Sequence, residues 1–173
     1  MSGADDAMMD RLARAQALAV QGHREEARAL YAALYAEALG SGDPYWACVA
    51  AHFLAHMQGT AEAQRDWHLR ALAAADAVGD ERILAFYPSL HANLAEVYLR
   101  LNDPAQACAH LAQARAAERL PPGTGDPSVA LLIERVTQAL DGAGAKSPVG
   151  IALRCRRRCS IKIGTPRTGA TPD

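Results

Sequence analysis

The spacing of apolar residues along this chain is that of amphipathic helices. Apolar side chains return every three or four residues, which gathers them on one face of a helix, and glycine or proline turns interrupt the pattern at short intervals. The predicted helical segments span residues 5–20, 23–39, 45–57, 61–78, 81–101, 102–119 and 128–140. Six of these segments pair into hairpins at about 5–40, 44–78 and 81–119, and a single helix at about 127–140 follows them.

The composition favours the same all-α fold class. The 173 residues include 39 Ala but only two Phe and two Trp. Alanine costs the least of any residue to place in a helix, whereas the β-branched and aromatic runs that strands prefer are scarce. The length is that of one domain, which we expect at residues 1–141, followed by a basic tail at 142–173.

A common register links the three hairpins. In each hairpin an alanine of the first helix is followed 12 residues later by an alanine of the second, with a larger residue four positions beyond. These positions are Ala15, Ala27 and Tyr31; Ala51, Ala63 and Trp67; and Ala95, Ala107 and Leu111. Helices approach closely where both present small residues, and a large neighbour then fills the adjacent hollow. The register predicts three similarly packed hairpins, although a generic antiparallel bundle with alanine at its crossings shares this periodicity.

This register resembles the tetratricopeptide repeat (TPR) family, whose repeats carry a large residue, Leu and a small residue, an aromatic, and later Ala followed by Phe. The third hairpin matches most fully, with His91, Leu94, Ala95 and Tyr98. The resemblance covers about residues 5–119 and implies a right-handed α-solenoid of three TPR-like hairpins plus a C-terminal capping helix. Because the first-helix alanines are 36 and then 44 residues apart, we expect a longer outer helix or loop in the second hairpin.

The TPR resemblance also implies a concave binding groove lined by the first helix of each hairpin. We expect a peptide or partner segment to lie there, as in a scaffold or regulatory protein. The candidate partner-binding residues are Tyr45, Cys48, His52, His56, Ser89, Asn93, Glu96 and Arg100. Of the positions with which some TPR proteins clamp a chaperone's C-terminal carboxylate, only Asn93 matches, so that ligand is not expected.

Two histidines in this set leave three interpretations open. His52 and His56 are one helical turn apart and share a face. They are ordinary polar residues of a half-exposed helix, hydrogen-bonding groups of the groove, or metal ligands together with His91 or Glu96. The HExxH zinc motif would need a glutamate where Phe53 stands, so we expect no metal or cofactor. A metal-binding or enzymatic protein that uses His52, His56, His91 and Glu96 remains an alternative.

No catalytic motif is evident in the sequence. The run Gly142–Ser147 lacks the glycine that a phosphate loop carries before its lysine, and it follows a helix rather than a strand. The carboxylate pairs at residues 25–26 and 80–81 lie at helix starts, where they complement the helix dipole. The sequence therefore predicts a binding protein rather than an enzyme.

Charge divides the chain at about residue 141. Up to that residue, 11 Lys and Arg stand against 18 Asp and Glu, a net charge of −7, whereas residues 142–173 hold seven Lys and Arg and one Asp, a net charge of +6. An acidic body is a poor match for nucleic-acid backbones. We expect the tail to be largely disordered, with its basic stretch 154–162 either solvated or in contact with an anionic partner.

The N-terminal residues predict a cytoplasmic location. The first ten residues lack the basic and apolar regions of a signal peptide, and the apolar stretches are too short to span a bilayer. The sequence leaves open whether the chain forms a homodimer. Its frequent use of Ala and Arg is typical of proteins from high-GC bacteria. A ligand-sensing TPR domain of a transcriptional regulatory system is a second alternative function.

Overall fold

The structure, a computed structural model, describes residues 3–118 and 126–145. Its helices are α1 (Gly3–Val20), α2 (Arg24–Ser41), α3 (Pro44–His56), α4 (Ala61–Ala77), α5 (Tyr87–Arg100), α6 (Pro104–Ala117) and α7 (Pro127–Ala145). A short 3-10 helix, η1 (Glu81–Phe86), precedes α5. No strand occurs in these two ranges, so the predicted all-α class is confirmed.

Asp–Pro pairs begin three of the described helices, α3, α6 and α7, and the pairs of α3 and α6 share one capping geometry. Asp43 precedes Pro44 at the start of α3, and its carboxylate accepts a hydrogen bond of 3.1 Å from the backbone N–H three residues on. Asp103 and Pro104 begin α6 in the same way, with a bond of 3.0 Å. Capping an otherwise free N–H stabilises a helix by about 1 kcal/mol, and the fixed φ of proline suits the first helical position. These dipeptides therefore determine where α3 and α6 start.

Glycine is required at two of the turns. Gly22, between α1 and α2, has φ +88°, and Gly42, between α2 and α3, has φ +69°. Residues with a Cβ rarely adopt this left-handed conformation, whereas glycine does so at little steric cost. The two glycines let the chain reverse within a few residues at both ends of α2, so that its neighbours lie antiparallel to it.

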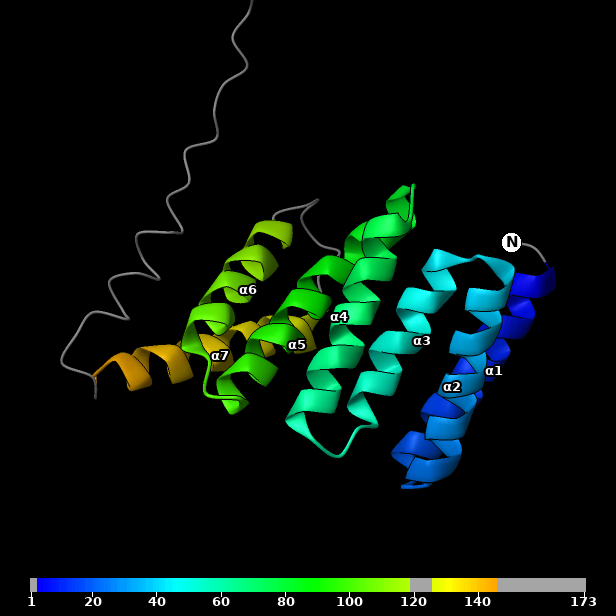
Figure 1. Cartoon of the computed structure of the whole chain (residues 1–173), viewed down its shortest axis with the longest axis horizontal. Helices are drawn as coiled ribbons and strands as arrows, with labels where there is room; N and C mark the ends of the chain where they lie inside the picture. Colours follow the sequence, from blue (N-terminus) through cyan, green and yellow to red (C-terminus); the bar gives the residue numbers. More distant parts are fainter. Residues whose placement is uncertain (1–2, 119–125, 146–173) are drawn as a thin grey trace, which may run out of the picture.

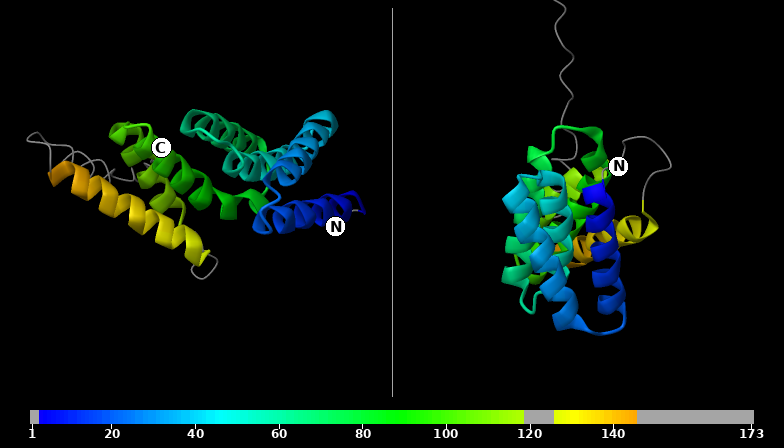
Figure 2. Two further views of the ribbon diagram at one scale, coloured as in Figure 1. Left: turned by 90° about the horizontal axis from the view of Figure 1, so that it is seen from below. Right: turned by 90° about the vertical axis from the view of Figure 1, so that its right-hand side faces the viewer.

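Helices α1 to α6 follow one another in chain order along the long axis of the molecule, and α7 runs across α5 and α6 (Figure 1). Each helix from α1 to α5 packs against the next, and α7 packs on both α5 and α6. Seen from below, α2, α4 and α6 lie along one side of the row, and α1, α5 and α7 lie along the other (Figure 2). The first helices of the first and third hairpins therefore share one side of an elongated molecule.

Alanine lines the contacts between paired helices. Five of the six predicted register positions are 0% exposed. They are Ala15, Ala27, Ala51, Ala95 and Ala107. Ala15 and Ala27 belong to one apolar cluster, and Ala95 and Ala107 belong to another. In the first and third hairpins, the small residues of the two helices thus meet as the register predicts.

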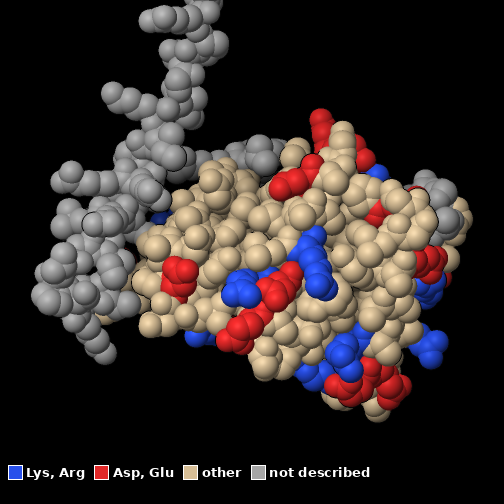
Figure 3. Space-filling model, in the orientation of Figure 1, with Lys and Arg blue, Asp and Glu red and all other residues tan. Residues whose placement is uncertain are grey.

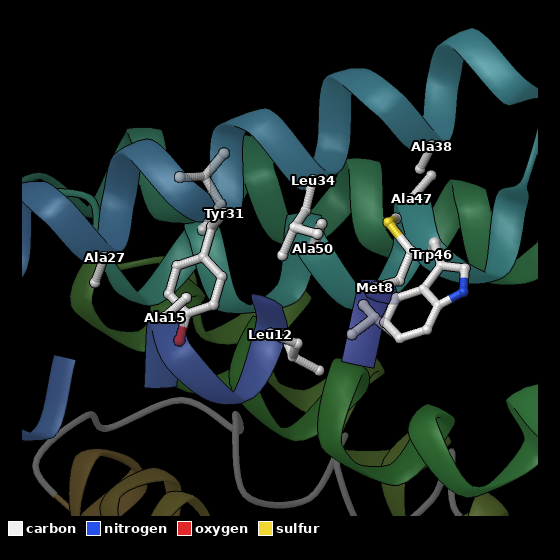
Figure 4. Close-up of a cluster of buried hydrophobic side chains, with 12 residues drawn as sticks. Met8, Leu12, Ala15, Ala27, Tyr31, Leu34, Ala38, Trp46, Ala47 and Ala50 are labelled. Atoms are coloured by element: carbon white, nitrogen blue, oxygen red, sulfur yellow. The ribbon is translucent and has the colours of Figure 1, made fainter. Parts of the chain in front are cut away.

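The first of these clusters shows how a large residue completes an alanine contact. Tyr31 on α2 is 1% exposed, and its ring reaches toward Ala15 on α1 (Figure 4). The same ring stacks on Phe53 of α3, with centroids 5.5 Å apart. One aromatic side chain therefore joins three consecutive helices.

The second hairpin departs from the predicted register. Ala63 is only half-buried, because it lies in the first turn of α4, where its N–H donates to the capping Thr60 hydroxyl at 3.2 Å. Ala51 instead shares its cluster with Ala71 and Ala75, farther along α4. The distance in sequence from Ala51 to Ala95 is longer because the connection between α4 and α5 contains the six residues of η1. The outer helix is not longer, since α4 has 17 residues and α2 has 18. The extra residues lie in the connection and not in the outer helix.

Helix α7 closes the C-terminal end of the row. Ile133, Val136 and Leu140, three residues of its predicted apolar stripe, are buried in the cluster that contains Ala95. The helix continues to Ala145, beyond its predicted end at residue 140. Residues 146–173, which hold most of the predicted tail, lie outside the described residues.

Ala95→Trp is expected to lower the free energy of unfolding by about 1–3 kcal/mol, because an indole overfills a fully buried contact between α5 and α6. Urea unfolding followed by circular dichroism measures the change. Ala109→Trp places the same side chain on the exposed face of α6 and should shift stability by no more than about 0.5 kcal/mol. Equal stability of the two variants would contradict the observed packing.

Candidate functional site

The predicted binding residues divide into an accessible set and a buried set. His56 and Arg100 are exposed, and Tyr45, Ser89 and Glu96 are half-buried. All five residues belong to α3 and α5, the first helices of the second and third hairpins. These side chains are the ones that a partner can reach.

Three other predicted binding residues are buried, which removes them from the binding surface. Cys48 is 0% exposed, and His52 and Asn93 are each 8% exposed. The Asn93 amide turns back on its own helix and donates to the Ser89 carbonyl at 2.8 Å. Cys48 and His52 lie in the middle of α3, where every residue from 46 to 52 is buried, and Asn93 lies in the buried run 92–95 of α5. Sharing a helix face therefore does not imply exposure.

Burial also determines the chemistry of Cys48. Its thiol lies in the cluster of Ala51, Ala71 and Ala75. Loss of solvent, with a smaller contribution from the Asp76 carboxylate, raises the pKa of Cys48 to about 12. The thiolate is the nucleophilic and metal-binding form, so this cysteine is an inert part of the core.

Three imidazoles meet where α3 packs on α4. His52 and His56 come from α3 and His68 comes from α4, and we refer to these residues as the histidine cluster. The ring centroids of His52 and His56 are 5.0 Å apart, those of His52 and His68 are 5.6 Å apart, and those of His56 and His68 are 5.2 Å apart. Periodicity along one helix predicts the first pair but carries no information about a residue of the facing helix, so His68 was missed.

The two inner imidazoles of the cluster are neutral. Burial, followed by the nearby His56, lowers the pKa of His52 from 6.5 to about 3. Burial lowers the pKa of His68 to about 2, with smaller contributions from His52, His56 and Arg100. The Nδ1 atoms of both His52 and His68 are buried without a hydrogen-bond partner. An imidazolium at either position would therefore have neither water nor an acceptor for that nitrogen.

Charged groups from two neighbouring helices face the histidine cluster. Although His56 is exposed as a residue, loss of solvent around its ring beside the other two rings of the cluster lowers its pKa. Glu96 of α5 acts in the opposite direction, and Arg24 at the start of α2 lowers the pKa further. Glu96 is itself ion-paired with Arg135 of α7. The surroundings of the histidine cluster therefore contain two arginines, Arg24 and Arg100, and one carboxylate, Glu96, which is already ion-paired.

A second histidine pair lies between α5 and α6. The Nδ1 atoms of His91 and His110 are 3.0 Å apart, so one nitrogen donates to the other. The His91 ring also stacks on Tyr87, and the His110 ring stacks on Tyr98. The structure therefore pairs His91 with His110 and not with the histidine cluster. Within the described ranges, no three His, Cys, Asp or Glu side chains are arranged to hold a metal ion.

Polar side chains connect the accessible residues across four helices. Arg24 of α2 donates to the carbonyl of His56, the last residue of α3, at 2.8 Å. Arg100 of α5 donates to the Gln64 side chain of α4 at 2.8 Å. The Gln64 amide in turn donates to the carbonyl of Gln58 at 3.0 Å. We call this set, with the neighbouring Glu96–Arg135 ion pair, the polar network. Arg24, Gln58, Gln64 and Arg135 were missed because their roles depend on contacts between distant segments.

The surface charges are mixed and not separated by sign. In the orientation of Figure 1, Lys and Arg side chains lie next to Asp and Glu side chains, and wide uncharged areas surround them (Figure 3). No single-sign patch on this face is large enough to favour a polyanionic or polycationic partner by charge alone.

Further observations bear on the nature of the site. Among the helices of the described ranges, none has the length and hydropathy needed to cross a membrane. The basic stretch 154–162 lies outside the described residues, so its anionic partner stays a prediction. The chain matches no protein-family model, no curated protein and no solved structure.

Proposed function

We propose that this chain is a TPR-like interaction module that binds a peptide or partner segment along α3 and α5. In this proposal the three hairpins form a right-handed solenoid, and the accessible side chains of α3 and α5 form the binding surface. The protein acts as a scaffold or regulator and performs no chemistry on its partner.

The accessible side chains of α3 and α5 support this function. His56 presents a donor or an acceptor, Glu96 an acceptor and Arg100 several donors. Contacts with Gln64 of α4 and Arg135 of α7 hold the Arg100 and Glu96 side chains, and Arg24 of α2 holds the backbone of α3 at His56. Beneath them the helices meet through fully buried alanines. Polar groups fixed on rigid elements lose little side-chain entropy when a partner binds, which favours affinity.

The chemistry of Arg100 indicates what the partner carries. A guanidinium has five N–H donors, and Nη1 of Arg100 uses one of them on Gln64. The remaining donors suit a carboxylate, which accepts two N–H bonds from one guanidinium. The module therefore binds a segment with an acidic side chain or a C-terminal carboxylate at this position.

Arg100→Glu is expected to weaken binding at least tenfold, or about 1.4 kcal/mol. The probe is a fluorescent peptide selected against the wild-type protein from a random display library, and fluorescence anisotropy measures its Kd. The charge reversal removes the donors and adds repulsion toward a carboxylate.

Arg28→Glu is the matched control for this experiment. Arg28 is an exposed arginine of α2 whose ion pair, with Glu25 at 2.8 Å, lies within its own helix. Its reversal should change the Kd less than about twofold, since surface charges away from a contact act weakly. Equal losses in the two variants, or selected peptides that bind both as tightly as wild type, would refute binding at α5.

A further inference from the structure

The histidine cluster has a property that peptide binding does not require. His52 and His68 are 8% and 2% exposed, yet each leaves a buried Nδ1 without a hydrogen-bond partner. A core position that needed only shape would be filled at lower cost by an aromatic hydrocarbon such as phenylalanine. Imidazole is the side chain whose charge changes between about pH 5 and 8.

We propose that the histidine cluster is a proton-sensitive switch, which loosens the α3–α4 hairpin when the pH falls below about 6. The switch rests on geometry: three rings lie within 5.0–5.6 Å of one another, and a proton on His52 or His68 places a charge inside the contact between α3 and α4. The device does not depend on the binding function proposed above.

The groups that face the cluster do not offer a stable place for a charged imidazole. Arg24 from α2 and Arg100 from α5 act against protonation of His56 and His68, respectively. Glu96 of α5 favours protonation of His56, but Arg135 of α7 already holds that carboxylate. An imidazolium in the cluster is therefore stabilised most by solvation, and separation of α4 from α3 brings water to the charged ring.

The position of the cluster determines where the hairpin opens. His56 is the last residue of α3 and is exposed, so the cluster begins at the solvent edge next to the α3–α4 turn. The apolar contact of Ala51 with Ala71 and Ala75 lies farther from that turn and contains no histidine. Opening starts at the turn, and it releases Gln64 of α4 from Arg100. Any partner held beside Arg100 would then bind more weakly, a consequence that rests on the proposed function.

Hydrogen exchange of the full-length chain tests the switch. Amide protection is measured by mass spectrometry at about pH 7.5 and about pH 5.5, with labelling times scaled to the intrinsic exchange rates. A histidine that is neutral when buried takes up a proton when the hairpin opens. One pH unit below the ordinary imidazole pKa, each such histidine raises the equilibrium constant for opening about tenfold. Protection of peptides from residues 52–70 should therefore fall at least tenfold more than that of peptides from residues 3–41, whose one histidine, His23, is exposed.

His52→Phe/His68→Phe identifies the cause. Phenylalanine keeps a ring of similar size and cannot take a proton, so the pH-dependent loss of protection should disappear. His23→Gln is the control and should retain the full loss. If the double variant does not fold, each single variant should reduce the loss by about tenfold.

Two results would overturn the switch. An equal loss of protection in residues 3–41 and 52–70 of the wild-type protein would mean that acid unfolds the whole chain at once. Persistence of the loss in the phenylalanine variants would assign it to other groups. Neither result affects the peptide assay with Arg100→Glu, which is performed above pH 7 and tests the binding function separately.

Discussion

Leu90→Ala is expected to lower the free energy of unfolding by about 2–5 kcal/mol. Leu90 on α5 is 0% exposed and joins the cluster of Ala51, Ala71 and Ala75 from the second hairpin. The loss is large because Leu90 is fully buried in a cluster that includes three buried alanines, whose side chains cannot rotate to fill the vacated space. The cavity therefore persists, and its cost adds to the lost transfer free energy.

Urea unfolding monitored by circular dichroism measures this loss. Leu131→Ala is the matched control, since Leu131 on α7 is 66% exposed and its truncation should change stability by at most about 0.5 kcal/mol. Because a domain of this size is stable by only about 5–15 kcal/mol, the Leu90 variant should show a clearly lower midpoint. A midpoint equal to that of the control would mean that α5 does not pack on the second hairpin as described.

Acidification from pH 7 to pH 5 should cost the folded protein about 4 kcal/mol through His52 and His68 alone. Both groups have a folded-state pKa below the unfolded value of 6.5, so the unfolded chain binds more protons and stability falls as the pH falls. The loss begins near pH 6.5 and continues until the folded-state pKa is reached, about 3 for His52 and about 2 for His68. At pH 5 the protein is about 1.5 units below the unfolded pKa, which gives about 2 kcal/mol for each residue.

Urea midpoints recorded at intervals from pH 8 to pH 5 test this dependence. Wild-type protein and His23→Gln should give parallel curves that fall steeply below about pH 6.5, whereas His52→Phe/His68→Phe should give a flatter curve. A wild-type curve as flat as that of the double variant would show that both imidazoles are as easily protonated in the folded chain as in the unfolded one.

The helices of this protein follow from local signals in its sequence. The Asp43–Pro44 and Asp103–Pro104 pairs mark helix starts, and Gly42 marks a helix end, because capping and turn geometry depend on a few adjacent residues. The alanine register was correct for the first and third hairpins. It was wrong for Ala63, because α4 starts so late that this residue falls in its first turn.

The candidate site was less predictable than the fold. Periodicity places His52 and His56 on one helix face, but whether that face meets solvent or another helix depends on the packing of α4. His68 and Arg135 enter the site from segments far along the chain, so no local pattern identifies them. His56, Glu96 and Arg100 were predicted from the groove positions that the TPR resemblance implies, and the structure leaves all three at least partly exposed.

The order of helices along the row has a consequence for how the chain acquires its structure. The packing runs mainly between consecutive helices, so the residues that meet are separated by short stretches of chain. Proteins dominated by contacts between residues close in sequence lose less chain entropy before the first stable contacts form, and they fold within microseconds to milliseconds. Growth can begin at any hairpin and extend to its neighbours, and α7, which reaches back over α6 to α5, joins once the third hairpin exists.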